Sequence, residues 1–333
     1  MERKRKSSFI MLRVTYVAVS LLFCVVLLEG CSFVLPLGKA TSLVETSVGG
    51  TGRDKVLLVD VSGMISGKKR SRALGLMERP SLVERVKEEL EKAEEDNAVK
   101  AVVLRINSHG GTVTASDIIH HEVEQFKERT GKVIIAEMLD VAASGGYYIA
   151  AAADTIIAHP TTVTGSIGVA AFKFNARGLM EKVGVEDETI LSGDKKDIGS
   201  PMRALTPEER EILQSIIDDL YERFLDVVAE GRKEIGREKL REIADGRVYS
   251  ARQALDLKLI DEIGYLDDAI EAAKSEAGLE KARVVTYGRP SDYKGSIYSL
   301  AGVGLPSTIN LIGLDGEALV ERFGMRIMYR WMP

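Results

Sequence analysis

Four short apolar runs rich in β-branched residues mark the middle of the chain and predict buried strands. They lie at 56–61, 101–106, 133–138 and 155–158, and segments with helical periodicity separate them. A run that is apolar at every position, instead of at alternate positions, is typical of a strand covered on both faces. The alternation of such strands with helices predicts repeated βαβ units around a mostly parallel sheet, and therefore an α/β fold.

Three helix starts carry capping signals. Each has a serine or threonine three residues before a glutamate or glutamine, and these first residues are Ser81, Thr206 and Ser250. The hydroxyl of the serine or threonine and the side chain of the glutamate or glutamine can each accept a hydrogen bond from an otherwise unpaired N–H group at the start of the helix. After the second of these starts, apolar residues recur at helical spacing from 209 to 233. This pattern predicts a long amphipathic helix that packs on the core or on another subunit.

The N-terminus has the pattern of a membrane-targeting segment. Basic residues between positions 3 and 13 precede an uncharged apolar run at 14–28, and apolar character resumes at 31–37. We expect a retained anchor over 1–37, with the basic residues in the cytoplasm and the rest of the chain outside the plasma membrane. The alternative is a lipoprotein, processed before Cys31 and lipidated there, although Glu29 is unusual in such a cleavage motif.

Composition divides the remaining chain into three parts. Residues 38–53 are rich in Gly, Ser and Thr without periodicity, which predicts a flexible spacer. A single folded domain is expected over 54–287, and the tail at 288–333 has no pattern that assigns it a role.

Charge and cysteine content exclude several classes of function. The chain has 333 residues and a formal net charge of -5, so it offers no broad basic surface for nucleic acid. Its two cysteines, Cys24 and Cys31, both lie in the N-terminal apolar region. The folded part therefore has no disulfide framework and no thiolate metal site, and any nucleophile there carries oxygen.

Ser144 lies at a position that suits a nucleophile. It follows a strand-like run at 132–138 and precedes Gly145, Gly146 and an apolar stretch, so it occupies a strand-to-helix turn. The glycines allow a sharp turn, and the unpaired N–H groups of the following helix point toward an oxygen that the serine attacks. A tight loop without catalytic function would have the same small residues.

A serine nucleophile needs a base, and histidines and lysines both qualify. The histidines are His109, His120, His121 and His159. We expect the adjacent pair to face solvent on a charged helix, whereas His109 and His159 lie at turns. Lys195 and Lys196 lie in a non-periodic loop at 191–201, where functional residues often occur.

A second glycine turn, at 107–111, follows the strand at 101–106 and leads into a helix. Its glycine N–H groups could approach a substrate closely and stabilise an oxyanion. An ordinary strand-to-helix loop explains the pattern equally well.

Four motifs in order resemble the bacterial signal peptide peptidase family of the SppA type. They are Ala-Ala-Ser-Gly-Gly-Tyr-Tyr at 142–148, Thr-Gly-Ser-Ile-Gly-Val at 164–169, Lys-Asp-Ile-Gly-Ser-Pro at 196–201 and Gly-Arg-Val-Tyr-Ser at 246–250. The resemblance covers about 55–273 and implies a ClpP/crotonase-like fold, with 54–287 as a peptidase domain.

The resemblance also implies a Ser/Lys dyad. It makes Ser144 the nucleophile and Lys196 the general base, with Lys195 as a bystander. Gly111 and Gly145 match the oxyanion positions, and Ser166 is a candidate for orienting the lysine. The family pattern requires no metal and no other cofactor.

Two positions depart from the family pattern. His109 replaces a proline in the turn at 107–111, which puts an ionisable group near the expected site. Lys258 stands where the family commonly has glycine, before Leu-Ile-Asp at 259–261, which puts one turn in doubt.

The resemblance extends to partners. The chain has one copy of the motif set, which implies a homo-oligomeric ring in which Ser144 and Lys196 meet across a subunit boundary. Expected partners are peptides, above all remnant signal peptides with small or apolar residues in the pocket, and membrane lipid. The alternatives are an acyl-CoA hydratase or thioesterase on the same fold, and an inactive membrane-tethered scaffold.

Overall fold

The computed structural model describes residues 42–72, 77–289 and 325–333. The segment at 1–37, predicted to be a membrane anchor or signal segment, lies outside these ranges. Among the described residues, no helix is both long enough and apolar enough to cross a bilayer.

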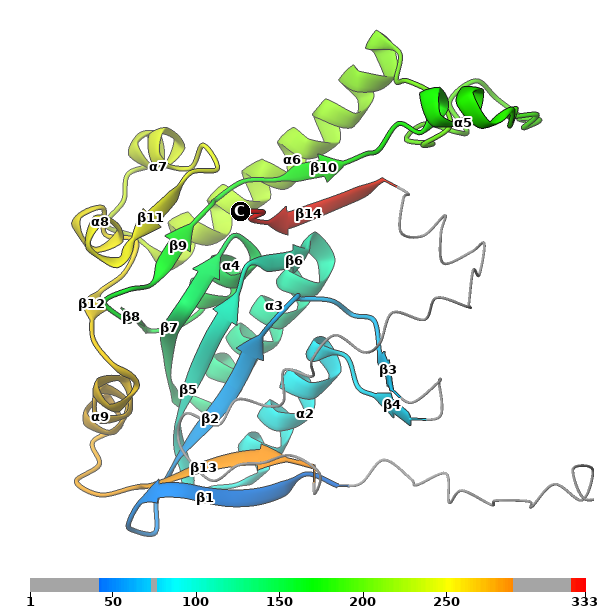
Figure 1. The fold of residues 1–333 in the computed structure, drawn as a ribbon. Helices are drawn as coiled ribbons and strands as arrows, with labels where there is room; N and C mark the ends of the chain where they lie inside the picture. The colour runs from blue at the N-terminus through cyan, green and yellow to red at the C-terminus, as the bar shows by residue number, and fades with distance from the viewer. Residues whose placement is uncertain (1–41, 73–76, 290–324) are drawn as a thin grey trace, which may run out of the picture. The chain divides into compact units, whose positions relative to one another are not determined.

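A largely parallel sheet forms the centre of the molecule (Figure 1). The four predicted strands are confirmed as β2 (Lys55–Ser62), β5 (Val99–Ser108), β7 (Val133–Ala143) and β8 (Thr155–Ala158). They lie side by side in this order and pair in parallel. The flanking strands are β1 (Val44–Gly50), β13 (Arg283–Gly288) and β12 (Glu262–Ile263), and the sheet order is β1-β13-β2-β5-β7-β8-β12.

Helices cover both faces of this sheet, which explains why its strands are apolar at successive positions. Leu57 and Val59 pack in the cluster shared with α2 (Leu82–Glu95) and α3 (Val113–Thr130). Their neighbours Val56 and Leu58 pack in the cluster shared with α9 (Leu266–Glu276). All four side chains are at most 1% exposed. Alternate residues of each strand thus enter different cores, as in other doubly covered sheets.

The edge of the sheet differs from the sequence expectation. Residues 44–50, placed in a spacer at 38–53, form β1 (Val44–Gly50), which pairs antiparallel with β13 (Arg283–Gly288). The folded part therefore begins before Asp54. The strand escaped detection because its Ser, Thr and Gly residues lack an apolar period, and the pairing with β13 supplies the backbone hydrogen bonds.

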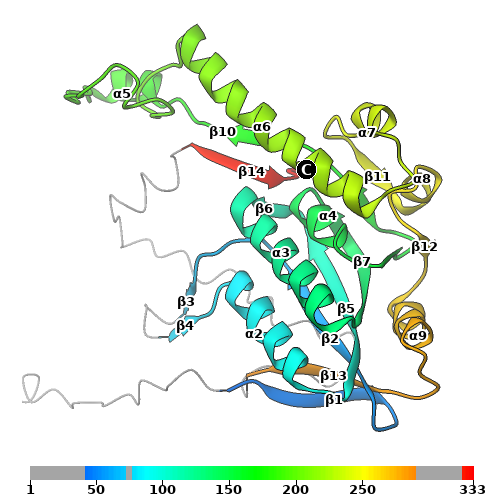
Figure 2. The same ribbon diagram turned by 180° about the vertical axis from the view of Figure 1, so that it is seen from behind.

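A second, three-stranded sheet has the order β10-β14-β6. Its strands are β6 (Gly110–Thr112), β10 (Ala170–Phe172) and β14 (Arg326–Arg330). β14 belongs to the tail at 288–333, to which the sequence assigned no role, and it pairs antiparallel with both neighbours. Figures 1 and 2 both place it beside β10 and above α4 (Gly145–Ala150).

The remaining elements surround this framework. They are β3 (Arg70–Arg72), β4 (Met77–Arg79), α4 (Gly145–Ala150), β9 (Val163–Gly165), α5 (Arg177–Val183), α6 (Pro207–Gly231), α7 (Arg237–Ile243), β11 (Val248–Ser250), α8 (Ala251–Asp256) and β12 (Glu262–Ile263). The long amphipathic helix is confirmed as α6. All three predicted capping boxes are present, at Ser81, Thr206 and Ser250.

Candidate active site

Ser144 joins β7 to α4 in a strained conformation. Its φ of 53° and ψ of −115° lie outside the regions that a side-chain-bearing residue ordinarily adopts. Its N–H donates to the Gly165 carbonyl over 2.7 Å, while its hydroxyl does not cap the helix. The surrounding structure therefore holds the serine at a sharp strand-to-helix turn, the geometry by which other hydrolases present a nucleophile.

The second glycine turn packs directly against this one. Gly110 has a φ of 95°, and its N–H donates to the Ser108 hydroxyl over 3.0 Å. A Cβ on Gly110 would lie 2.8 Å from the Gly145 nitrogen, and a Cβ on Gly145 would lie 2.4 Å from the Ser116 hydroxyl oxygen. A Cβ at either position would clash with these atoms, so the two turns can pack this closely only because both residues are glycine.

Gly111 lies in the same turn, within β6. A Cβ there would lie 1.8 Å from the Ile65 carbonyl oxygen, so this position too accepts only glycine. The structure thus brings Ser144 and both predicted oxyanion positions, Gly111 and Gly145, to one place.

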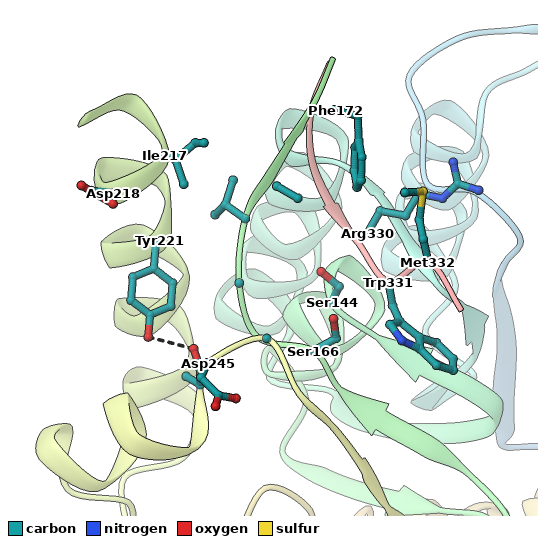
Figure 3. A pocket seen from close by; sticks show the side chains of 15 residues that line it. Ser144, Ser166, Phe172, Ile217, Asp218, Tyr221, Asp245, Arg330, Trp331 and Met332 are labelled. Carbon is teal, nitrogen blue, oxygen red and sulfur yellow. Dashed lines mark hydrogen bonds between the residues drawn. The ribbon is translucent and has the colours of Figure 1, made fainter. Parts of the chain in front are cut away.

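Ser166 lies beside Ser144. It follows β9, which pairs in parallel with the end of β7, and its N–H donates to the Arg247 carbonyl over 2.7 Å. It also has a positive φ, of 50°. Ser144 and Ser166 line one cavity, and Figure 3 shows both hydroxyls directed into it.

Lys196 lies elsewhere in this chain. It is exposed, in the loop between α5 and α6, and it does not line the cavity. Its neighbour Lys195 binds Glu208 in the first turn of α6, at 2.5 Å. The first α6 residue that lines the cavity, Ile217, comes nine residues after Glu208, about 14 Å along the helix at 1.5 Å per residue. Figure 1 likewise shows α5 and its loop beyond the far end of β10.

A charge cluster fixes the lysine loop to α6. Arg203 binds Asp197, which directly follows Lys196, and Glu209, each at 2.6 Å. Arg203 and the Thr206 backbone N–H hold the pKa of the buried Glu209 down at about 2, so this carboxylate stays charged. The exposed lysine therefore extends from a firmly attached loop.

The histidines are placed differently from one another. His120 does not face solvent as expected: it is 2% exposed, because its side of α3 packs against Tyr148. His109 is exposed and stacks on Trp331, with ring centres 5.5 Å apart. His159 lies against Tyr265. None of these three lines the cavity that contains Ser144.

An aromatic cluster below the serine was missed by the sequence analysis. Tyr148 of α4 lies 5.0 Å from Phe224 of α6 and 5.1 Å from Tyr329 of β14, measured between ring centres. Tyr148 donates to Asp117 over 2.5 Å. The tyrosine pair after Ser144 was a visible signal, but its partners are distant in sequence and no local pattern indicates them.

Within the described ranges, no cluster of three or more His, Cys, Asp or Glu side chains could hold a metal. The polar side chains that line the cavity belong to Ser144, Ser166, Asp218, Tyr221, Asp245 and Arg330, and the glycine turns place backbone N–H groups beside Ser144. Such a set can attack a carbonyl and stabilise the oxyanion once a base is supplied.

Two family profiles match the chain. Residues 126–280 match peptidase family S49, and residues 68–164 match Clp protease. The second match agrees with the order of βαβ units, and the fold is of the ClpP/crotonase-like α/β class.

Three relatives show how far the similarity extends. A protein named as a signal peptide peptidase SppA of Enterococcus faecium is 38% identical over 243 residues, 73% of this chain and 70% of that protein. A protein named as a protease of Synechocystis sp. is 39% identical over 70% of this chain and 78% of its own length. The chloroplastic serine protease SPPA of Arabidopsis thaliana is 36% identical over 79% of this chain and 38% of its own length.

Proposed function

Because the chain belongs to the SppA-type peptidase family S49 and is a serine peptidase, we propose that it cleaves peptides at the membrane with a Ser144/Lys196 dyad. Remnant signal peptides are the proposed substrates. One observation carries the assignment of the nucleophile: strained Ser144 lies against two glycine turns and beside an open cavity.

The base comes from a second copy of the chain in this proposal. Lys196 does not line the cavity that contains Ser144, and it is exposed on a loop that Arg203 attaches to α6. Large apolar side chains are exposed on the same loop and on α5 and α6. They include Leu179 at 65%, Val183 at 64%, Ile190 at 96% and Ile216 at 41%. A neighbouring subunit that covers them would bury apolar area and bring Lys196 toward a cavity, as in a ring.

The mechanism follows from these positions. Neutral Lys196 takes the Ser144 proton, and the oxygen attacks the substrate carbonyl. The N–H groups of Gly111 and Gly145 stabilise the oxyanion, and Ser166 orients the lysine amine. The protonated lysine then donates to the leaving amine, and the same lysine activates the water that releases the acyl group.

The membrane association proposed here rests on the N-terminal sequence. An anchor or signal segment over 1–37 would hold the peptidase domain outside the plasma membrane and next to lipid. Peptides that remain in the bilayer after secretion would then be nearby.

The test uses purified full-length protein in detergent, a quenched apolar peptide and a fluorophosphonate probe. Ser144→Ala should abolish both peptide cleavage and labelling, and Lys196→Ala should lower cleavage by at least about a thousandfold. The matched control is Lys195→Ala, which removes the neighbouring lysine and should leave the rate within about twofold.

Substantial activity in either dyad variant would contradict the proposed roles. Adding an acyl-CoA substrate to the same assay separates the other enzyme hypothesis, because a hydratase or thioesterase would turn it over and leave the peptide intact. Failure to turn over either substrate would favour the scaffold.

A further inference from the structure

Helix α4 has the nucleophile at its N-terminus but is very short. It has six residues, Gly145–Ala150, and the first two are glycine. A helix of this length is not stable in water by itself. The strained backbone of Ser144 likewise persists only where the surrounding structure enforces it. The direction of the Ser144 hydroxyl therefore depends on the contacts that hold α4.

Two adjacent residues of α3 provide such contacts. Ser116 is completely buried, and a Cβ on Gly145 would lie 2.4 Å from its hydroxyl oxygen. Its neighbour Asp117 accepts a hydrogen bond from the Tyr148 hydroxyl over 2.5 Å. Tyr148 is also connected to the nucleophile, because its N–H donates to the Ser144 carbonyl over 2.8 Å. Helix α3 thus contacts the first turn of α4 at both of its ends.

The same carboxylate also binds α6. Arg223 donates to the Asp117 oxygen that accepts from Tyr148, over 3.1 and 3.3 Å. Burial raises the pKa of the Asp117 carboxyl, but the hydrogen bonds from Tyr148 and Arg223 outweigh it and leave the pKa below its ordinary value. The carboxylate is therefore charged at neutral pH, and hydrogen bonds to a charged acceptor are stronger than those between neutral groups.

The Tyr148 ring is held in the core of the molecule. It is completely buried, with its centre 5.0 Å from that of Phe224 and 5.2 Å from that of His120. Without Asp117 its hydroxyl would be buried with no hydrogen bond, at a cost of about 1–3 kcal/mol. Helix α4 would then shift to give the hydroxyl another partner, and Ser144 would move with it.

We propose, resting on the proposed function, that Asp117 is a positioning residue for Ser144. It acts through Tyr148, and together with Arg223 it fixes α4 against α3 and α6. Asp117 does not line the cavity that contains Ser144, so it acts on the nucleophile and not on the substrate. A misplacement of about 1 Å at a reacting atom can cost about a hundredfold in rate, so a contact of this kind matters for catalysis.

The first test compares kcat with KM for cleavage of the quenched apolar peptide by the full-length protein. Asp117→Ala and Tyr148→Phe should each lower kcat by about 10–100-fold and leave KM within about twofold, because the cavity is untouched. Labelling of Ser144 by the fluorophosphonate probe should slow by the same factor. The double variant should be no slower than the slower single variant, since both changes remove one hydrogen bond.

Two further variants serve as controls for this test. Asp117→Asn keeps an oxygen that can accept from Tyr148, so it should recover most of the rate that Asp117→Ala loses. Glu128→Gln changes an exposed carboxylate elsewhere on α3 and should behave as the wild type.

A second test places the same substitutions on different chains. When Ser144→Ala and Lys196→Ala subunits exchange, the restored sites take their serine from the Lys196→Ala chain and their lysine from the Ser144→Ala chain. Asp117→Ala on the chain that supplies the serine should lower the activity of the mixture by about 10–100-fold. On the chain that supplies the lysine, it should leave this activity within about twofold. Both mixtures contain the same three substitutions, so a general effect on folding or assembly would lower both equally.

The outcomes separate this proposal from the proposed function. Equal activity of the two mixtures, or a labelling rate of Ser144 that Asp117→Ala leaves unchanged, would overturn the positioning role and leave the peptidase in place. If subunits exchange without restoring activity, the shared site is wrong, and kcat and labelling of the Asp117 variants decide on the positioning role. If the wild type neither cleaves the peptide nor is labelled, the proposed function falls, and the positioning role falls with it.

Discussion

Apart from glycines, three described residues have a positive φ: Ser144, Ser166 and Lys258. The first two lie at the proposed site, where strain of this kind often accompanies function. Lys258 lies far along the chain, just after α8, with a φ of 63°. The family commonly has glycine at this position. Glycine adopts a positive φ without strain, whereas lysine does not, which explains why this turn departs unfavourably from the family pattern.

Lys258→Gly should therefore stabilise the protein. Glycine removes the Cβ strain of the left-handed conformation, and the added freedom of the unfolded chain offsets part of the gain, leaving about 0.5–1 kcal/mol. Urea unfolding would measure the change in the free energy of unfolding. Lys258→Ala keeps the Cβ and should give no gain, and equal stability of the Gly and Ala variants would contradict the explanation.

His120 should make stability fall in acid. Burial lowers the pKa of its imidazole to about 4, against the opposing effect of Asp117. The unfolded state, with a pKa near 6.5, binds more protons between these values. Stability is then fully present above about pH 6.5 and declines as pH falls toward 4, by on the order of 2 kcal/mol.

The measurement is the free energy of unfolding at pH 7 and pH 4.5. His120→Gln should show a smaller loss between these values than the wild type, because the residue that gains a proton is gone. The exposed neighbour His121 gives a matched control. The His121→Gln variant should lose as much free energy of unfolding between the two pH values as the wild type. Identical losses in all three proteins would assign the acid sensitivity to other groups.

At the scale of single residues, the sequence indicated those site residues whose position depends on their neighbours along the chain. Ser144 and the glycines could be found because a strand, a turn and a helix follow one another within a few residues. The packing of Tyr329 against Tyr148 could not be found, because it depends on a strand pairing across more than two hundred residues. His120 was misjudged because charged neighbours on its helix concealed that this side chain faces the core.

Among the elements, the loop between α5 and α6 carries Lys196, the base in the proposed mechanism. Arg203 joins Asp197 to Glu209 and so connects the position of Lys196 to the start of a long helix. Arg203→Gln should lower kcat by about 10–100-fold with little change in KM, because Lys196 loses its position while the cavity beside Ser144 is untouched.

Peptide cleavage kinetics measure this effect. Arg177→Gln removes an exposed arginine of α5 that pairs with Glu181, and its rate should stay within about twofold of the wild type. If both arginine variants keep full activity, the loop does not need this connection to place the lysine.

The hydrophobic and capping patterns of the sequence predict some of the helices and strands and not others. Strands β2, β5, β7 and β8 and the capped helices have strong local signals, and each was confirmed. β1 and β14 have none, since both are edge or inserted strands stabilised by backbone pairing with distant partners. Propensity alone does not identify such strands.

At the scale of the whole molecule, the proposed site needs two chains. Ser144→Ala and Lys196→Ala should each be inactive alone. If they exchange subunits in an equal mixture, about a quarter of the sites would combine an intact serine with an intact lysine. Peptide cleavage should then return to about a quarter of the wild-type rate. A mixture that exchanges subunits and stays inactive would place serine and lysine of each site in one chain.

The attachment of β14 to the rest of the chain has a consequence for dilution. A segment carried on the same polypeptide meets its partner strands at one fixed effective concentration, however dilute the protein is. The pairing of β14 with β6 and β10 is therefore independent of protein concentration. A contact between two subunits weakens as the protein is diluted, so dilution would separate subunits without releasing this strand.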